Sequence, residues 1–340
     1  MIETHIMGAG FAGLLIAQEL VDAGYDEIHL YDDSHPLKAS NAPLALCHPF
    51  PGRSLTPHPL LFSAYTQTQR WMRRWTQWDP HFVQELPMVR PSSASGASRL
   101  YASWQRVWEN QPHPTLNISA RADKTVTYSP CYSVRLGPLC SAWIQRLVDS
   151  GVHLHPTKVM DPFATSGQRI FCTGHRLGTW FPNLKVHTEG GELGTFGTHK
   201  PLDTLISGGG HIAPETPTSI VAGATRWTEA PTDKQAAWPV LKNIADRLWP
   251  HVGPPLNLWQ GARCIVKSDR LPLTGAVPNC PDTYVLGAFG SKGLLWGPYA
   301  AHCLAQLIIA QTEVPLSLST DRLPQVQWYQ GSTKPDLKPE

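Results

Sequence analysis

The sequence is poor in charge. Of its 340 residues only 16% are Asp, Glu, Lys or Arg, and the formal net charge is +2. Such a balance gives no strong electrostatic footprint, so nucleic-acid binding is neither demanded nor excluded. The seven cysteines include no C-x-x-C pair, and their odd number argues against a disulfide framework or a structural zinc site.

Long apolar runs and targeting signals are also lacking. No stretch is expected to span a membrane, and the first residues lack the basic and apolar regions of a signal peptide. We therefore expect a cytoplasmic protein with no membrane partner. His153 and His155 share one face of an expected strand, but no third ligand accompanies them, so no metal site is predicted.

The clearest positive feature is a glycine-rich turn near the N-terminus. Gly8, Gly10 and Gly13 form the pattern G-x-G-x-x-G between an expected strand and an expected helix. Gly8 permits the turn, Gly10 lets the backbone approach a pyrophosphate, and Gly13 lets the helix pack closely on the strand. The helix would run through Leu14 to Leu20 and stop at Gly24, and the positive dipole end at its N-terminus suits phosphate groups.

An acidic residue follows at the spacing that this motif requires. Asp32 comes directly after an expected strand over residues 28–31, about 20 residues beyond the last glycine, where an acid accepts hydrogen bonds from a ribose diol. Asp33 is a second candidate for this role. The next loop contains the small and hydrogen-bonding residues Ala39, Ser40 and Asn41, which suit a segment lying along a cofactor.

A second unit of strand, glycine turn and helix lies near the C-terminus. Residues 284–289 are predicted to form a strand, 290–293 a turn, and 294–312 a helix whose dipole would face an electron-rich group of a bound ring. A short buried strand over residues 169–174 ends in Thr173 and Gly174, where the backbone again meets a cofactor.

The middle of the chain is harder to interpret. A helix over residues 60–78 carries Trp71, Trp75 and Trp78 on one face, which favours a core stripe with a basic flank over a surface that stacks nucleic-acid bases. Residues 82–126 are expected to be irregular. The pattern around residues 208–225 predicts a hairpin of an antiparallel sheet, and residues 233–249 predict a helix.

Several of these segments together resemble one family. The matching segments are Gly8–Gly13, Asp32, the loop of residues 39–41, residues 261–264 and 271–278, and the closing turn and helix from Gly290 to Leu294. In this order they resemble the FAD-dependent oxidases of the D-amino-acid oxidase and glycine oxidase family. Within it, the chain is similar to the oxidase half of the bifunctional enzyme that modifies the wobble uridine of tRNA.

The resemblance implies a fold and a division into domains. The fold class is α/β, a Rossmann-like FAD-binding domain with an inserted antiparallel-sheet substrate domain of α+β type. The FAD-binding domain is expected over residues 1–80, 127–181 and 256–330, and the substrate domain over residues 82–126 and 182–255. Residues 331–340 are a tail.

The resemblance also implies a reaction. FAD, held without a covalent bond, would accept hydride at N5 from the carbon that bears an amine, and the imine would then hydrolyse. The substrate would be an amino acid or an N-carboxymethyl amine. Two alternatives stay open, namely the same chemistry on the carboxymethylaminomethyl group of a tRNA wobble uridine and a flavin dehydrogenase with an acceptor other than oxygen. The oligomeric state is not predicted.

Roles for single residues follow from the same resemblance. Arg263 matches the arginine that holds the substrate carboxylate through a planar, bidentate fork, and a structural ion pair is the alternative role. Lys292 would assist catalysis or touch the flavin. His211 occupies the place where many relatives have a tyrosine over the substrate, or is a core or surface histidine. The expected cofactor-binding residues are Gly8, Gly10, Phe11, Ala12, Gly13, Asp32, Asp33, Ala39, Ser40, Asn41, Val159, Thr173, Gly174, Gly290, Ser291, Lys292, Gly293, Leu294 and Leu295.

Overall fold

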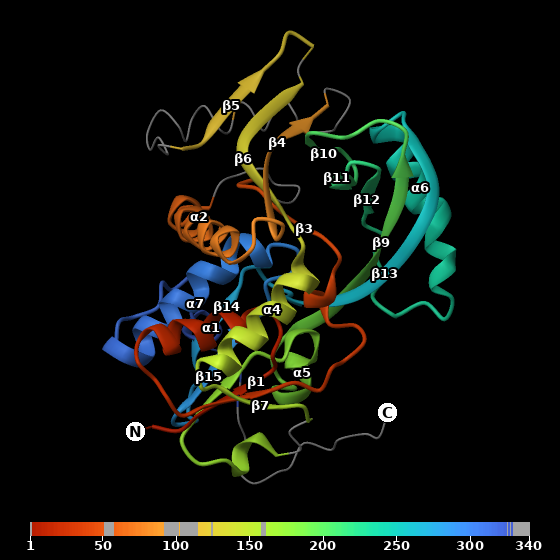
Figure 1. Ribbon diagram of the computed structural model, residues 1–340. Coiled ribbons are helices and arrows are strands. Elements are labelled where there is room, and N and C mark those ends of the chain that lie inside the picture. Colours follow the sequence, from red (N-terminus) through yellow and green to blue (C-terminus); the bar gives the residue numbers. More distant parts are fainter. Residues whose placement is uncertain are drawn as a thin grey trace. The chain divides into compact units, whose positions relative to one another are not determined.

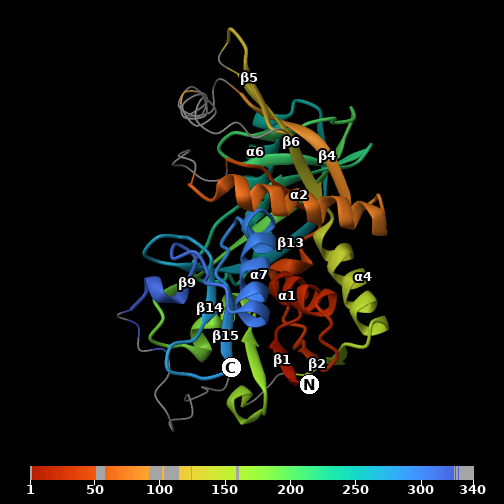
Figure 2. The same cartoon turned by 90° about the vertical axis from the view of Figure 1, so that its left-hand side faces the viewer.

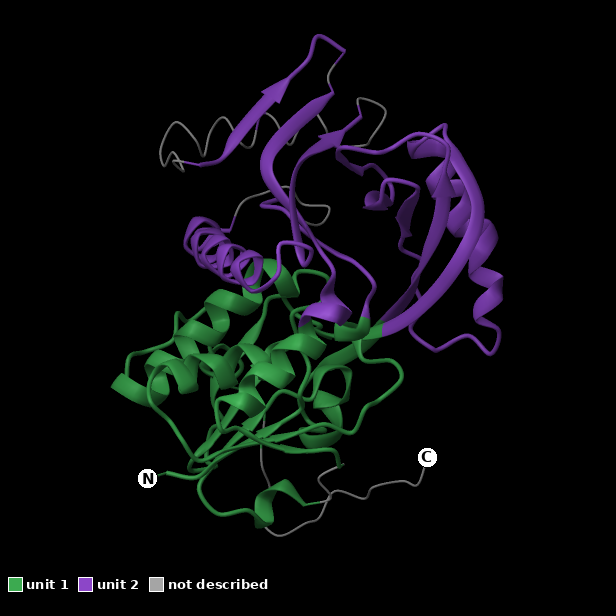
Figure 3. Ribbon diagram, in the orientation of Figure 1, with its two compact units in different colours: residues 1–41, 140–189, 262–340 green, residues 42–139, 190–261 purple. Residues whose placement is uncertain are grey.

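The chain forms two compact units, each assembled from separate stretches of sequence (Figure 3). A computed structural model describes residues 2–50, 58–91, 102, 115–123, 125–157, 161–324, 326 and 328. Unit 1 comprises residues 1–41, 140–189 and 262–340, and unit 2 comprises residues 42–139 and 190–261. Helix α4 (Leu136–Asp149) and strands β9 (Val186–Thr198) and β13 (Val252–Val266) each contain a boundary between them.

A six-stranded sheet forms the centre of unit 1 (Figure 1). Its strand order is β14-β15-β8-β1-β2-β7, and all neighbours are parallel except β14 and β15. The strands are β1 (Thr4–Met7), β2 (Ile28–Tyr31), β7 (His153–His155), β8 (Gln168–Phe171), β14 (Leu273–Ala276) and β15 (Thr283–Gly287). Together with helices α1 (Phe11–Asp22), α5 (Leu177–Trp180) and α7 (Gly293–Ala310), they confirm the predicted α/β class.

The order of the strands places a switch point beside β1. The chain moves from β1 to β2 and β7 on one side, and then returns to β8 and β15 on the other side. In open parallel sheets, ligands bind outside the carboxyl ends of the strands where the order reverses. The turns that follow β1, β8 and β15 all leave the sheet at this edge.

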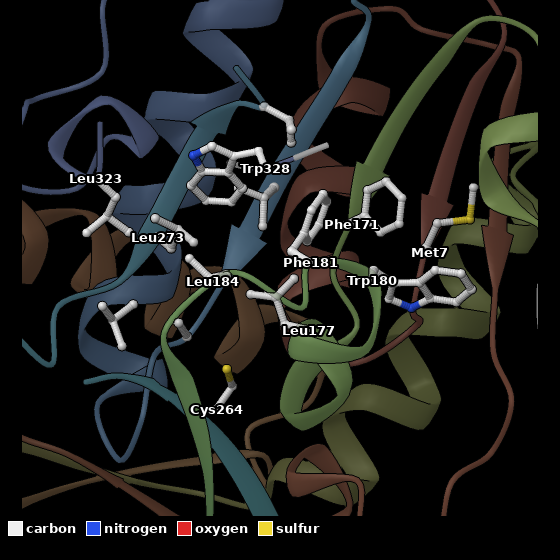
Figure 4. Packing of buried hydrophobic residues seen from close by; sticks show 14 residues of the cluster. Met7, Phe171, Leu177, Trp180, Phe181, Leu184, Cys264, Leu273, Leu323 and Trp328 are labelled. Atoms are coloured by element: carbon white, nitrogen blue, oxygen red, sulfur yellow. The ribbon is translucent and has the colours of Figure 1, made fainter. Parts of the chain in front are cut away.

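The two faces of this sheet pack differently. Ile6 of β1 faces α1, since a Cβ at Gly13 would lie 3.4 Å from its side chain. Met7 and Phe171 lie on the other face and belong to a core cluster with Trp180 and Phe181, which follow β8 (Figure 4). All four side chains are less than a tenth exposed, so apolar side chains cover the face of the sheet that is opposite to α1.

Histidines occupy the same face as Met7 at the β1–β2–β7 side. His5, His29 and His153 are paired in register on adjacent strands, and the ring centroids lie 5.0 Å apart for both neighbouring pairs. His155 joins them, because its Nε2 is 2.9 Å from His29 Nδ1. Two imidazole nitrogens at this distance share one proton, so one of the two rings must be neutral there.

Two carboxylates line the outer side of this histidine row. Glu3 Oε1 lies 3.2 Å from His5 Nε2 and 3.5 Å from His29 Nε2, and Glu27 Oε1 lies 3.4 Å from His29 Nε2. Burial is the largest cause that lowers the pKa of His5, and burial followed by His29 and His153 lowers the pKa of His155. In the part of the chain that the structure describes, no group of three or more His, Cys, Asp or Glu side chains is placed to hold a metal ion.

Helix α7 corrects one expectation from the sequence. By length and composition alone it could span a membrane, with a mean hydropathy of 1.3, whereas no such stretch was expected. However, 56% of the segment is buried, as is usual for a core helix. A Cβ at Gly297 would lie 2.9 Å from Leu15 and 3.0 Å from Phe11, so α7 packs closely on α1.

Unit 2 is built on a nine-stranded sheet. Its order is β13-β9-β12-β11-β10-β4-β6-β3, with β5 paired to β6 off this path. The strands not yet introduced are β3 (Ala45–Cys47), β4 (Val83–Arg90), β5 (Asn117–Ala120), β6 (Val126–Val134), β10 (Leu205–Ser207), β11 (His211–Thr216) and β12 (Ser219–Gly223). Helix α6 (Trp238–Leu248) covers one face, where its Leu241 packs with Ile212, Ile220 and Phe196.

The units differ from the predicted division of the chain at residues 182–189, which lie in unit 1, and at residues 256–261, which lie in unit 2. The larger differences concern residues 42–80 and 127–139. Both segments lie in unit 2, because β3 and β4 each pair with β6. The expectation that residues 82–126 are irregular is wrong for β4 and β5. The predicted hairpin is present as β11 and β12, which pair antiparallel; His211 lies opposite Gly223 at one end and Thr216 opposite Ser219 at the other.

Helix α2 (Leu61–Trp78) bears out the core interpretation of its tryptophans (Figure 2). Trp71 and Trp75 are 4% and 0% exposed, so neither ring is available for stacking on a base. The Arg74 guanidinium lies 5.2 Å from the Trp71 ring centre and 5.6 Å from that of Trp78, within range of a cation–π contact.

The histidine row predicts that acid weakens the fold. Because His5 and His155 resist protonation when folded, the unfolded chain binds more protons below its ordinary histidine pKa. The free energy of unfolding should therefore fall as the pH drops from about 7.5 to about 5.5, a range that stays above carboxylate titration. Urea denaturation of the wild type and of His155→Gln should show a shallower pH dependence in the variant. The exposed His81, changed to Gln, is the control; an equal effect of both substitutions would contradict this account.

Candidate active site

The glycine turn after β1 is closed by direct backbone contact. A Cβ at Gly13 would lie 1.9 Å from the Gly8 carbonyl oxygen, and a Cβ at Gly8 would lie 2.5 Å from the Cys172 carbonyl oxygen. Gly8 also has a φ of +114°, which other residues rarely adopt. Any side chain at Gly8 or Gly13 would therefore push α1 or β8 away from β1. Gly10 differs, because its nearest neighbours are the Ser40 hydroxyl at 3.2 Å and the Lys38 side chain at 3.7 Å.

A serine hydroxyl accepts a hydrogen bond from the first turn of α1. The Phe11 amide donates to Ser40 Oγ at 2.8 Å, and the N-cap, Gly10, has no side chain with which to cap the helix. Ser40 lies in the short helical turn Ala39–Asn41, so this segment lies against the glycine turn as the sequence predicted. The amides of Ala12 and Gly13 point to the same end of the helix, where the dipole favours a negative group.

Both acidic candidates for ribose binding take part in ion pairs. Lys38 Nζ lies 3.0 and 2.9 Å from the two carboxylate oxygens of Asp32, and both side chains are mostly buried. Asp33 pairs with Arg176. Asp32 can still accept from a ribose hydroxyl, because a carboxylate offers about four acceptor positions. Lys38 was not assigned a role from the sequence, although its position six residues after Asp32 was visible.

The start of α7 lies beside the start of α1. Gly290 adopts a φ of +55°, its amide donates to the Cys264 carbonyl oxygen at 3.0 Å, and Lys292 is the N-cap of the helix. A Cβ at Gly293 would lie 4.0 Å from the Phe11 ring. Ser291, Leu294 and Leu295 belong to the same turn and first helical turn. Two helix N-termini from opposite ends of the chain thus meet at one edge of the sheet.

A polar atom without a partner lies at this same edge. Thr173 follows β8, and its Oγ1 is buried with no hydrogen-bond partner in the described part of the chain. Gly174, with a φ of +57°, begins the next short helical turn. Bare glycine backbone and a buried hydroxyl without a partner fit a bound dinucleotide, which would supply the acceptor. Val159, also expected at this site, lies outside the described residues.

Arg263 is engaged by a neighbouring carboxylate. Its Nη2 and Nε lie 2.6 and 3.2 Å from Glu189 Oε2, and Arg270 Nη2 lies 3.7 Å from Glu189 Oε1. Glu189 is 12% exposed, so the pair is well shielded from water. Burial first, and the charge of Arg270 second, lower the pKa of Lys292, which places this lysine in the same charged group. In the structure Arg263 therefore forms an ion pair with Glu189, which is the alternative role that the sequence left open.

His211 belongs to unit 2. It is the first residue of β11 and lies opposite Ser207 of β10 and Gly223 of β12. A Cβ at Gly223 would lie 3.3 Å from the His211 ring and 2.2 Å from the Leu193 side chain, so the imidazole and Leu193 both pack against the glycine backbone. Arg263 and Lys292 lie in unit 1, with the glycine turns.

The fold and the glycine turn after β1 are typical of one class of protein, namely α/β proteins that bind a dinucleotide at the carboxyl edge of a parallel sheet. The chain belongs to the family of FAD-dependent oxidoreductases called DAO, whose model matches residues 4–307. The family resemblance found in the sequence is thereby confirmed, and the protein is an FAD-dependent oxidoreductase.

Solved structures and one curated protein are similar to the chain. Glycine oxidase from Geobacillus kaustophilus is 19% identical, with a TM-score of 0.77 over 93% of this chain and 97% of that one. Iminodiacetate oxidase from Chelativorans sp. BNC1 is 17% identical, with a TM-score of 0.76 over 93% and 99%. These likenesses confirm the fold.

The curated protein is the tRNA 5-methylaminomethyl-2-thiouridine biosynthesis bifunctional protein MnmC of Thiobacillus denitrificans, at 23% identity. The similarity covers 93% of this chain and 57% of that protein. The chain therefore spans a little over half the length of this curated relative.

Gly10 allows cofactor binding to be separated from folding. A methyl group there meets only the Ser40 hydroxyl and the Lys38 side chain, so Gly10→Ala should fold normally but block close approach of the pyrophosphate. We expect FAD to bind at least about tenfold more weakly, a loss of about 1.4 kcal/mol, in a titration followed by flavin fluorescence. Gly13→Ala should instead impair folding itself. Undiminished FAD affinity in a folded Gly10→Ala protein would remove Gly10 from the cofactor site.

Proposed function

We propose that this protein oxidises the C–N bond of a small amino acid or an N-carboxymethyl amine. The observation that carries the proposal is the meeting of the α1 and α7 N-termini at one sheet edge, within a family of FAD-dependent oxidoreductases. The names of the similar proteins indicate the substrate class. Glycine and iminodiacetate both carry an amine nitrogen bound to a carboxymethyl carbon, and both are small enough for an enclosed site.

FAD, when bound, would accept a hydride from the carbon next to the amine. The residues of this chain would hold the flavin ring and the substrate and stabilise the charge that develops on them. The positive end of α7 would stabilise negative charge that develops on the ring, since charge within the first helical turn feels the dipole most strongly. Lys292, half-buried beside Arg270, would add a positive charge at the same place.

We propose that the flavin is held without a covalent bond. The thiols nearest the glycine turns belong to Cys172 and Cys264, both less than a twentieth exposed. Burial raises the pKa of each of these thiols, so little reactive thiolate forms at neutral pH. Acid precipitation of the protein should leave the yellow colour in the supernatant.

A second candidate function is the same reaction on a modified wobble uridine in tRNA. The similarity to MnmC favours it, and the exposed Arg70 and Arg73 on α2 offer positive charge. The buried Trp71 and Trp75 are not available for stacking, and the net charge of +2 is small for a tRNA-binding surface. A gel shift with tRNA that weakens steeply with salt would support this candidate over the small substrate.

The test of the main proposal is an anaerobic substrate screen. The FAD-loaded protein is mixed with glycine, iminodiacetate, N-methylglycine and other amino acids, and the flavin absorbance near about 450 nm is followed. We expect bleaching by N-carboxymethyl amines, but not by the corresponding amines that lack the carboxylate. No bleaching by any amine would contradict the proposal. Peroxide formation on admitting air would identify oxygen as the electron acceptor. Bleaching without peroxide formation would indicate a dehydrogenase with another acceptor.

A further inference from the structure

Arg90, the last residue of β4, is a partly buried arginine with no ion-pair partner among the residues that the structure describes. Its Nε and Nη1 are both buried and have no hydrogen-bond partner among the described residues. A guanidinium is always charged at neutral pH and presents five N–H donors. Leaving such donors unpaired away from water costs several times more than a lost surface hydrogen bond, so native proteins rarely retain them without compensation.

The strand register shows which face of the unit 2 sheet Arg90 occupies. In β4, Arg90 and Met88 share a face, and Met88 lies opposite Tyr128 of β6 and Leu205 of β10. Met88, Tyr128 and Leu205 are at most 1% exposed. Arg90 therefore emerges at the end of a buried row on this inner face.

The same face carries His211. Ser207 lies two residues after Leu205 on β10, and His211 is its partner on β11. The alternate residues Ile206 and Ile212 point to the other face, into the core cluster that packs under α6. Arg90 and His211 thus lie on the side of the sheet that α6 does not cover, with strand β10 between their strands.

A third basic side chain completes this group, which we call the Arg90 cluster (Arg90, His211, His48 and Tyr128). His48 follows β3, and its Nδ1 is 3.5 Å from the Tyr128 hydroxyl. Burial first, then the charges of Arg90 and His211, lower the pKa of His48 to about 3, which shows that the groups are close and keeps this imidazole neutral. No carboxylate in the described part of unit 2 forms an ion pair with Arg90.

Arg263 is in the opposite situation, because Glu189 already satisfies its fork at 2.6 and 3.2 Å. To bind a substrate carboxylate, Arg263 would have to leave its shielded ion pair with Glu189. Breaking such a pair is costly. Arg90 has no such pair to lose, so the energetic balance favours Arg90 as the group that receives an anion.

We propose that Arg90 binds the carboxylate of the small amine substrate on the inner face of the unit 2 sheet, with His211 and Tyr128 bordering the same site. This inference rests on the proposed function for the identity of the anion. Arg263, to which the sequence assigned this role, is then a structural residue of the Glu189 ion pair.

Glycolate, a small carboxylate without an amine, is the probe, and glycolamide is its uncharged counterpart. Glycolate binding to the FAD-loaded protein is measured by the rise in melting temperature and by the shift of the flavin spectrum. Arg90→Met should weaken binding by at least about thirtyfold, and Arg90→Lys by a smaller factor, because an ammonium keeps the charge without the fork. Arg121→Met, which removes an exposed arginine from the same unit, is the matched control and should leave binding unchanged.

The outcomes separate the two proposals. The assignment would be overturned if Arg263→Met lost glycolate binding while Arg90→Met or Arg90→Lys kept full binding. It would also be overturned if the wild type bound glycolamide as tightly as glycolate, or bound neither compound. If Arg90→Met fails to fold, the Arg90→Lys variant decides the matter. If the wild type binds glycolate through Arg90 but oxidises no amine, the proposed function fails while the anion site stands.

Discussion

The constraint on which this structure depends is the close approach of backbone at the end of β1. The Gly8 carbonyl lies where a side chain at Gly13 would be, and the Cys172 carbonyl lies where one at Gly8 would be. These two contacts hold α1, β1 and β8 at distances that only glycine permits. Because β15 pairs next to β8, the same geometry brings the start of α7 to the start of α1. A cofactor site formed from helix ends and bare backbone follows from this packing rather than from any single side chain.

The sequence was sufficient to predict the backbone elements that surround this candidate site. A glycine pattern and the strand and helix around it are local features, and α1, α2, α7 and the β11–β12 hairpin all lie within a few residues of their predicted bounds. The turn at residues 290–293 could likewise be recognised without knowing its neighbours. What links the two turns is the non-local order β15-β8-β1, which the family resemblance supplied and local pattern did not.

The charged residues were less predictable, because a sequence shows a charge but not its partner. Asp32 and Arg263 were each assigned to a ligand, yet Lys38 and Glu189 occupy their charges in the structure. Glu189 lies 74 residues from Arg263 in sequence, and only the pairing of distant strands joins them. Arg90 was missed for a related reason. Its strand, β4, contains Gln84, Glu85 and Pro87 on an irregular pattern, and it forms only because β6 and β10 pair with its two edges.

The glycine turns and the Arg90 cluster differ in why their residues are needed. The glycines at the sheet edge are required by the fold itself, since a side chain at Gly8 or Gly13 would separate elements that pack in the core. The two buried donors of Arg90, which have no partner among the described residues, have no such structural use. These donors reduce the stability of unit 2 unless an anion compensates them, and replacement of Arg90 by an apolar side chain of similar length would remove that cost. An arginine kept in this position under a net stability penalty is most economically explained by a negatively charged ligand that binds to it. The identity of the substrate is therefore better sought in the side chains of the unit 2 sheet than in the glycine turns.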